Sequence, residues 1–234
     1  MPVTAVKTRT VKIVKATGPG GPALPLEEFT PEVLLDFFGD RISVDLLDCV
    51  VVPPDEDLNE WLAVNTHEFY EISKTIYTAI EDACTEACET CREMNAGPNF
   101  KYRWQDGKTY KKPTVVSAPQ YISLLYQWVS AQVMDESLFP TDSRNPLPKD
   151  FPKVVKNIFR RLFRVYAHIF LCHYNVVVER DLITVFNTCL AHFLLFAKTY
   201  QLIDPPELEP LAFILRSLDT PSRGAERPLA STGE

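Results

Sequence analysis

The sequence predicts an all-α protein, a bundle of helices that carries one small β-hairpin. Across four long segments, apolar residues recur at intervals of three and four, which is the spacing of one buried helix face. Helix-start signals precede several of these segments, with Ser, Thr or Asp ahead of proline or acidic residues. A hairpin signal, Asp-Gly between two aromatic stretches, occurs once. A bundle with a single hairpin accommodates all three observations.

The predicted elements follow the chain in order. Thr30-Pro31-Glu32 has the pattern of an N-cap followed by proline, and it predicts a short helix over 30–38. A long helix, with an interruption allowed, is predicted from about 58 to 92, because acidic residues precede it and apolar residues keep the helical period. The remaining predictions are a hairpin over 99–112 and helices over about 119–134, 152–178, 180–201 and 206–217.

The chain is long enough for one large domain, with segments of different composition at its ends. Residues 1–25 combine Gly, Pro, Thr and Lys without apolar periodicity, and we expect a disordered basic arm there. Residues 26–52 are an N-terminal extension with the short helix, and 53–218 are the helical domain. The final segment, 219–234, has the composition of a disordered tail.

Charge is spread unevenly along the chain. The net charge is −7, but residues 1–25 carry four basic and no acidic residues, so the remainder is at −11. An acidic body argues against nucleic-acid binding and predicts a basic partner, although acidic surface can serve solubility alone.

Runs of 18 apolar residues are absent from the sequence, so membrane insertion is not expected. A secretory signal is also absent, which predicts a cytoplasmic protein with reduced cysteines.

Cysteines and histidines cluster in two places. Cys84, Cys88 and Cys91 lie within eight positions, while His168 and His173 have the H-x4-H spacing of paired zinc ligands. In a reducing compartment, such clusters usually bind metal, so we predict a structural zinc ion (Zn2+). Five residues on a straight helix separate two side chains by about 140°, so the histidines converge better at a distorted or ending turn. The alternative is a set of buried cysteines and core histidines without metal.

Signatures of catalysis are absent from the sequence. A catalytic zinc keeps an open position beside a general base, but H-E-x-x-H and the deaminase H-x-E pattern do not occur. The nucleophile-elbow and phosphate-loop patterns are absent too. The chain is therefore predicted not to be an enzyme, and a zinc hydrolase is the less favoured alternative.

One predicted helix carries a basic stripe. Lys156, Arg160 and Arg164 repeat every four residues, and Arg161 widens the stripe. Guanidinium groups bind phosphate through two hydrogen bonds, and clustered arginines capture phosphorylated peptides. The alternative is a solvated helix face with ordinary salt bridges.

Several motifs together resemble the Mob (Mps one binder) family of kinase co-activators. The resemblance covers about residues 53–217. It implies a bundle of helices around a zinc-stabilised core, and a protein that is not an enzyme. The matching motifs are LNEWLAVNTHEFY, CTEA, ETCREM followed by AGP, KKPTVVSAPQYI, LFPTDSRNPLPKDF and RRLFRVYAHIF.

The resemblance also implies which residues bind metal and phosphate. Cys84, Cys91, His168 and His173 correspond to the family's zinc ligands, with Cys88 the alternative ligand. In the family four residues separate the two cysteines, whereas six separate Cys84 from Cys91. The basic motif of the family forms a pocket for phosphorylated Hippo-type upstream kinases or scaffolds, and here it comprises Arg160, Arg161 and Arg164, with Lys156 beside them.

An acidic face is the third site that the resemblance implies. It would bind the basic N-terminal regulatory segment of a kinase of the NDR/LATS type, in Hippo-like signalling, mitotic exit or cytokinesis. The nucleus, the spindle poles and the division site are further expected locations. A phosphopeptide-reading adaptor that activates no kinase is the alternative. The residues of the acidic face are Glu56, Asp57, Glu60, Trp61 and Glu68.

Overall fold

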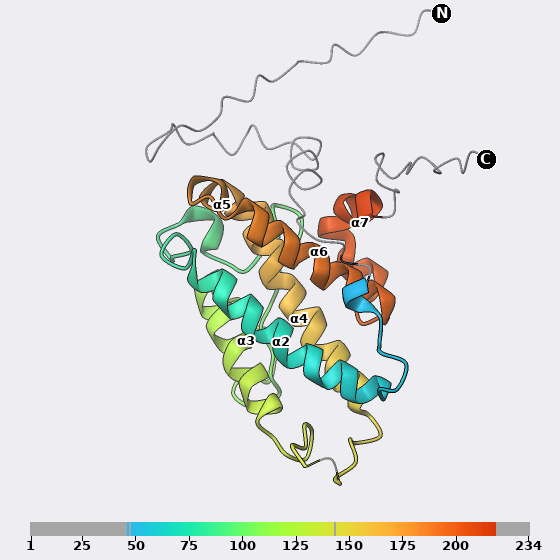
Figure 1. The fold of residues 1–234 in the computed structure, drawn as a ribbon. Coiled ribbons are helices and arrows are strands. Elements are labelled where there is room, and N and C mark those ends of the chain that lie inside the picture. The colour runs from blue at the N-terminus through green and yellow to red at the C-terminus, as the bar shows by residue number, and fades with distance from the viewer. Residues whose placement is uncertain (1–45, 47, 143, 219–234) are drawn as a thin grey trace, which may run out of the picture.

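Helices surround the central helix α4 in the computed structural model of the chain, which describes residues 46, 48–142 and 144–218 (Figure 1). The predicted all-α bundle is confirmed. In chain order the elements are η2 (Asp48–Val50), α2 (Leu58–Thr78), η3 (Glu89–Cys91), α3 (Ala118–Val133), α4 (Phe151–Cys172), α5 (Tyr174–Glu179), α6 (Ile183–Thr199), η4 (Pro205–Leu211) and α7 (Ala212–Leu218), where η marks a 3₁₀ helix.

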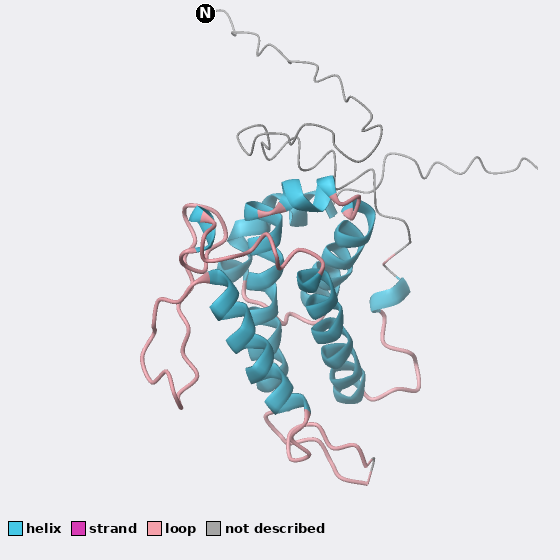
Figure 2. Ribbon diagram, turned by 90° about the vertical axis from the view of Figure 1, so that its left-hand side faces the viewer, coloured by secondary structure: helices cyan, strands magenta, loops and turns pink. Residues whose placement is uncertain are grey.

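The core lies where α2, α3, α4 and α6 meet. Helices α2, α3 and α4 run side by side along the length of the bundle, and α6 packs on α2 (Figure 1). Phe69 of α2 lies edge-on to Phe159 of α4 and to Phe193 of α6, with ring centroids 5.5 and 5.6 Å apart. The loop between α3 and α4 extends beyond one end of the helices (Figure 2). Interlocked aromatic rings from three helices therefore fix the bundle.

Two helices begin where the sequence predicts. The Asp57 carboxylate accepts hydrogen bonds from the amides of Asn59 and Glu60 at the start of α2. Ser117 caps α3 in the same manner by accepting from the amide of Gln120. Each cap satisfies amides that have no partner within the helix, which stabilises the helix by about 1 kcal/mol.

The helix predicted over 58–92 is shorter in the structure, because α2 ends at Thr78. Residues 80–91 form successive tight turns instead, including Cys84 N–H to Glu81 O at 3.1 Å and Cys91 N–H to Cys88 O at 3.0 Å. On a continuous helix, Cys84 and Cys91 would lie about 10.5 Å apart along the axis. The turns let both thiols approach one point.

The helix predicted over 152–178 is divided at His173 into α4 and α5. His173 has φ −135° and ψ 15°, outside the helical region. This ending turn allows the rings of His168 and His173 to approach, with centroids 5.0 Å apart. The sequence predicted that one of the two histidines would lie at a distorted or ending turn, and His173 occupies such a turn.

The predicted hairpin over 99–112 does not form a pair of strands among the described residues. Trp104 and Thr114 exchange two backbone hydrogen bonds of 2.8 Å as an isolated antiparallel bridge. Pro113 has no amide to extend the ladder. The Asp106 carboxylate accepts from the amides of Lys108 and Tyr110, and the amides of Asp106 and Gly107 donate to the Tyr110 carbonyl, so these bonds close the turn at the tip of the loop. A closed turn and one isolated bridge thus take the place of the expected pair of strands.

Several predictions concern the ends of the domain. The predicted helix over 206–217 begins as η4 and continues as α7. The predicted arm 1–25, helix 30–38 and tail 219–234 lie outside the described residues. Leu46 and Val50 are buried in the core, and Tyr200 donates a hydrogen bond to the Val50 carbonyl.

Among the described helices, none combines the length and the apolar character that crossing a membrane requires.

Candidate metal centre and arginine cluster

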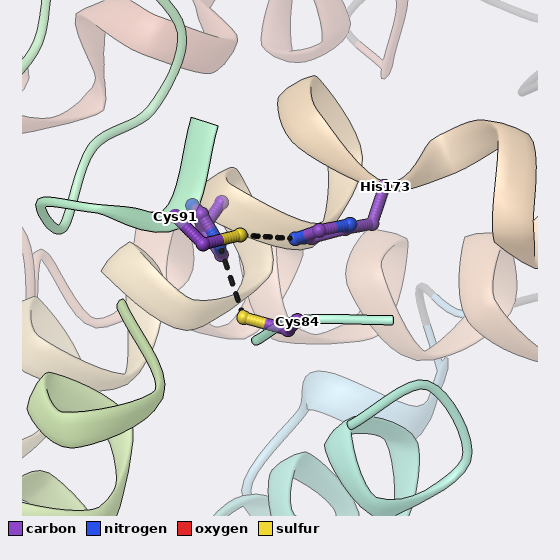
Figure 3. A group of neighbouring side chains, drawn as sticks. Cys84, Cys91 and His173 are labelled. Carbon is purple, nitrogen blue, oxygen red and sulfur yellow. Dashed lines mark hydrogen bonds between the residues drawn. The ribbon is translucent and has the colours of Figure 1, made fainter. Parts of the chain in front are cut away.

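Two cysteines and two histidines converge at the junction of α4 and α5. The ligand atoms of Cys84, Cys91, His168 and His173 all lie within 4.8 Å of one another, and all four residues are buried. Figure 3 shows Cys84, Cys91 and His173 pointing toward one another, the cysteines from the turns after α2 and His173 from the end of α4. We call these four residues the metal cluster.

Within the metal cluster, the distances from His168 to the two cysteine sulfurs match those between the ligands of a tetrahedral zinc ion. Adjacent ligands of such an ion lie about 3.3–3.8 Å apart, given the usual Zn–S and Zn–N bond lengths. The His168 Nε2 atom is 3.5 Å from the Cys84 sulfur and 3.7 Å from the Cys91 sulfur. The Cys91 sulfur is 3.1 Å from His173 Nε2, which is slightly shorter than this range. Four protein donors leave no open position, which is typical of a structural site.

Asn95 orients the metal cluster from outside. Its carbonyl lies 2.8 Å from His168 Nδ1, so that nitrogen donates and Nε2 is left with a lone pair toward the cysteines. The Asn95 amide donates to the carbonyls of Thr90 and Glu93, which flank Cys91. One residue thus ties the loop that carries Cys91 to helix α4.

Contacts within the metal cluster shift the pKa values of its side chains. Burial lowers the pKa of His168, but hydrogen bonds with the thiols of Cys172 and Cys91 outweigh it and raise that pKa to about 10. The hydrogen bond between the Cys84 and Cys91 thiols lowers the pKa of Cys84 and raises the pKa of Cys91. Because metal ligands must be deprotonated, a divalent cation bound here would displace protons from the thiols.

Cys88 lies outside the metal cluster. Its sulfur is partly buried and lies 3.2 Å from the Thr90 hydroxyl. The turn between Thr85 and Cys88, closed by a 3.0 Å backbone bond, separates it from the converging ligands. The structure therefore brings together Cys84 and Cys91, and not the pair Cys88 and Cys91.

Arg160, Arg161 and Arg164 of α4 form the arginine cluster, which is embedded in aromatic side chains. The Arg161 guanidinium lies between the rings of Trp104 and Trp128, 4.6 and 4.4 Å from their centroids. It donates to the Gln105 carbonyl at 2.7 Å. These contacts exclude the solvated helix face that the sequence left open for Arg161.

Arg164 and Arg160 are also held by neighbours. Arg164 donates to the Tyr121 hydroxyl at 2.8 Å and lies 4.8 Å from the centre of the Tyr102 ring. Arg160 donates to the Asn157 side chain at 2.8 Å. Lys156, one turn earlier on α4, is exposed. Three guanidinium groups thus gather on one side of α4, with Lys156 beside them.

Comparison with known proteins identifies the family. The model of the Mob1/phocein family matches residues 41–211, most of the chain. The chain belongs to the Mob1/phocein family. It is 44% identical to the maintenance of ploidy protein mob1 of Schizosaccharomyces pombe over 176 residues, which are 75% of this chain and 83% of that protein. The Arabidopsis thaliana protein MOB kinase activator-like 1A is 45% identical over 76% of this chain and 82% of its own length.

A human member of the Mob1/phocein family gives a similar match. MOB kinase activator 3A is 44% identical over 169 residues, which are 72% of this chain and 77% of the human protein. The names of the plant and human relatives describe kinase activators, which are regulatory proteins. The predicted membership of the Mob family is confirmed.

The acidic residues expected on the surface of this Mob1/phocein domain lie just before α2 and along its first half. Glu56, Glu60 and Glu68 are exposed, while Asp57 is the N-cap of the helix. Trp61 is half-buried, with its ring centroid 6.5 Å from that of Phe196. Trp61 and Asp57 therefore have structural roles in addition to any role on this face.

Some residues at these sites were missed by the sequence analysis. Val64 is 65% exposed and lies one helical turn from both Glu60 and Glu68, so an apolar residue interrupts the acidic face. Asn95 and Glu207 also escaped notice, because their contacts are made across the fold. The sequence did offer a signal for Val64, because it is an apolar residue at a helix position whose neighbours one turn away are acidic. No such sequence signal marked the other two residues.

Proposed function

We propose that this protein is a non-catalytic regulatory subunit that binds and activates a Ser/Thr kinase of the NDR/LATS type. Its context would be Hippo-like signalling, mitotic exit or cytokinesis. The observation that carries the proposal is membership of a family whose similar members are named kinase activators. Its sites of action would be the cytoplasm, the nucleus, the spindle poles or the division site.

A structural zinc ion is part of this proposal. Cys84, Cys91, His168 and His173 would hold it, supported by the close approach of their buried ligand atoms. The metal would cross-link the turns after α2 to the end of α4. Because a metal that binds only the folded chain adds its binding free energy to folding, the ion would stabilise the scaffold and leave the chemistry to the kinase.

The acidic face would receive the basic N-terminal regulatory segment of the kinase. Exposed Glu60 and Glu68 lie two turns apart on α2, with Val64 between them. Carboxylates attract a basic helix and set its orientation, and an apolar residue between them supplies contact area. This arrangement supports a helical, basic and partly apolar partner.

Binding of such a segment tests the proposal. We expect a labelled peptide from the N-terminal regulatory region of an NDR/LATS-type kinase to bind the full chain, and Glu60→Lys to weaken binding by at least about tenfold. Glu179→Lys at the exposed end of α5 makes the same charge change elsewhere and serves as the control. Equal binding by the two variants would contradict the proposed face. Kinase stimulation in the same samples tests activation.

A phosphopeptide-reading adaptor is the second candidate function. The arginine cluster favours it, because Arg161 and Arg164 are held in place by aromatic rings before any ligand arrives. Phosphorylated upstream Hippo-type kinases or scaffolds would be the ligands, and Lys156 would add charge at the edge. Full phosphopeptide binding without any kinase stimulation would favour the adaptor over the activator.

A further inference from the structure

A carboxylate from the C-terminal part of the domain reaches the arginine cluster. Glu207 belongs to η4, which packs on α4. One Glu207 carboxylate oxygen lies 3.3 Å from an Arg164 terminal nitrogen, and the other lies 4.0 Å from an Arg160 terminal nitrogen. A single acidic side chain thus bridges two of the three clustered guanidinium groups.

Residues other than Glu207 also hold these arginines in place. The Tyr121 hydroxyl and the Tyr102 ring fix Arg164, and the Asn157 side chain accepts from Arg160. The Glu207 side chain remains 30% exposed, so it can turn toward water without disturbing a packed core. Its principal local effect is to neutralise positive charge.

A carboxylate and a phosphate offer guanidinium groups the same kind of oxygen acceptors. We propose that Glu207 is a built-in competitor: an anionic phosphate group must displace it from Arg164 and Arg160 in order to bind. The inference rests on the phosphate-binding role proposed above for the arginine cluster. Glu207 would weaken binding of phosphate and lower the net positive charge of the arginine cluster while no ligand is bound.

Titration of the full chain with inorganic phosphate tests the inference. The experiment compares wild type, Glu207→Gln and Glu209→Gln at constant ionic strength and follows the NMR signals of the arginine Nε–H groups. Glu209 is exposed on the same 3₁₀ helix, so its variant removes one negative charge without freeing the arginines. We expect Glu207→Gln to bind phosphate about three- to tenfold more tightly, and Glu209→Gln to remain within about twofold of wild type.

Other results would overturn the inference. Unchanged phosphate affinity in Glu207→Gln would show that Glu207 does not compete, and weaker affinity would show that it positions the arginines. Lack of phosphate binding by every variant would refute the phosphate site itself, together with the competitor. If Glu207→Gln fails to fold by circular dichroism, Glu207→Asp replaces it. Aspartate keeps the charge but is too short to bridge both arginines, so phosphate should displace it more easily and bind more tightly. Weaker phosphate binding by Glu207→Asp would refute competition.

Discussion

Helix α4 carries two clusters whose surroundings differ. The metal cluster lies at its C-terminal end, where Cys91 and His168 are fully buried. The arginine cluster lies in its middle, where the Arg160 side chain is 40% exposed. Both use residues from the segment between α2 and α3, namely Cys84, Cys91 and Asn95 for the metal cluster and Tyr102, Trp104 and Gln105 for the arginine cluster.

The comparison separates residues that hold the fold from residues that meet a ligand. A buried set of four donors is complete within the chain, so a change there acts mainly on stability. Charged groups at a half-exposed surface retain capacity for an external partner, so a change there acts mainly on binding. Measuring stability and binding for variants of each cluster tests this division.

The largest effect is expected for Cys91→Ser in the zinc-loaded protein. Cys91 contacts both histidines, so its loss should release the metal and lower the free energy of unfolding by about 3 kcal/mol or more. Metal analysis and thermal unfolding provide the measurement. Cys88→Ser is the control and should change stability by less than about 0.5 kcal/mol. Metal release by Cys88→Ser alone would refute the ligand set.

A smaller effect is expected for Asn95→Ala. This change removes the amide that donates to the Thr90 and Glu93 carbonyls, so Cys91 is less well placed. We expect a loss of about 1–3 kcal/mol in stability and about tenfold in zinc affinity, measured by competition with a chelator. Asn99→Ala, an exposed position in the same loop, should leave both unchanged. Equal effects of the two changes would argue against a role for Asn95.

For Arg160→Gln we expect a loss of phosphate binding with little loss of stability, in contrast to the changes at the metal cluster. It should weaken phosphate binding by about tenfold, while metal content stays constant and stability changes by less than about 1 kcal/mol. Phosphate titration and thermal unfolding on the same samples measure both. Arg144→Gln removes an exposed arginine from the α3–α4 loop and is the control. A large loss of stability with intact phosphate binding would reverse the division between the clusters.

The smallest effect is expected for Val64→Thr on the acidic face. Threonine keeps the shape of valine but adds a hydroxyl, so the kinase-segment peptide should bind about two- to threefold more weakly. Val185→Thr, at an exposed position of α6, is the matched control and should have no effect. Fluorescence titration with the labelled peptide measures both. Indistinguishable binding by the two variants would place Val64 outside the interface.

The sequence by itself determined the all-α class, the helix starts at Asp57 and Ser117 and the residues that could bind metal. These features depend on local patterns, because caps and apolar periodicity act within a few residues. The resemblance to Mob proteins selected Cys84, Cys91, His168 and His173, the same four that converge in the structure.

Only the tertiary structure decided where α2 stops, why α4 breaks at His173 and how the arginine cluster is enclosed. The tight turns after Thr78 bring the two thiols together, and the break in the helix at His173 brings its ring close to that of His168. The Glu207 carboxylate reaches Arg164 across 43 positions of sequence. Spacing along the chain cannot reveal such contacts, because the physical reason for them is the packing of η4 on α4.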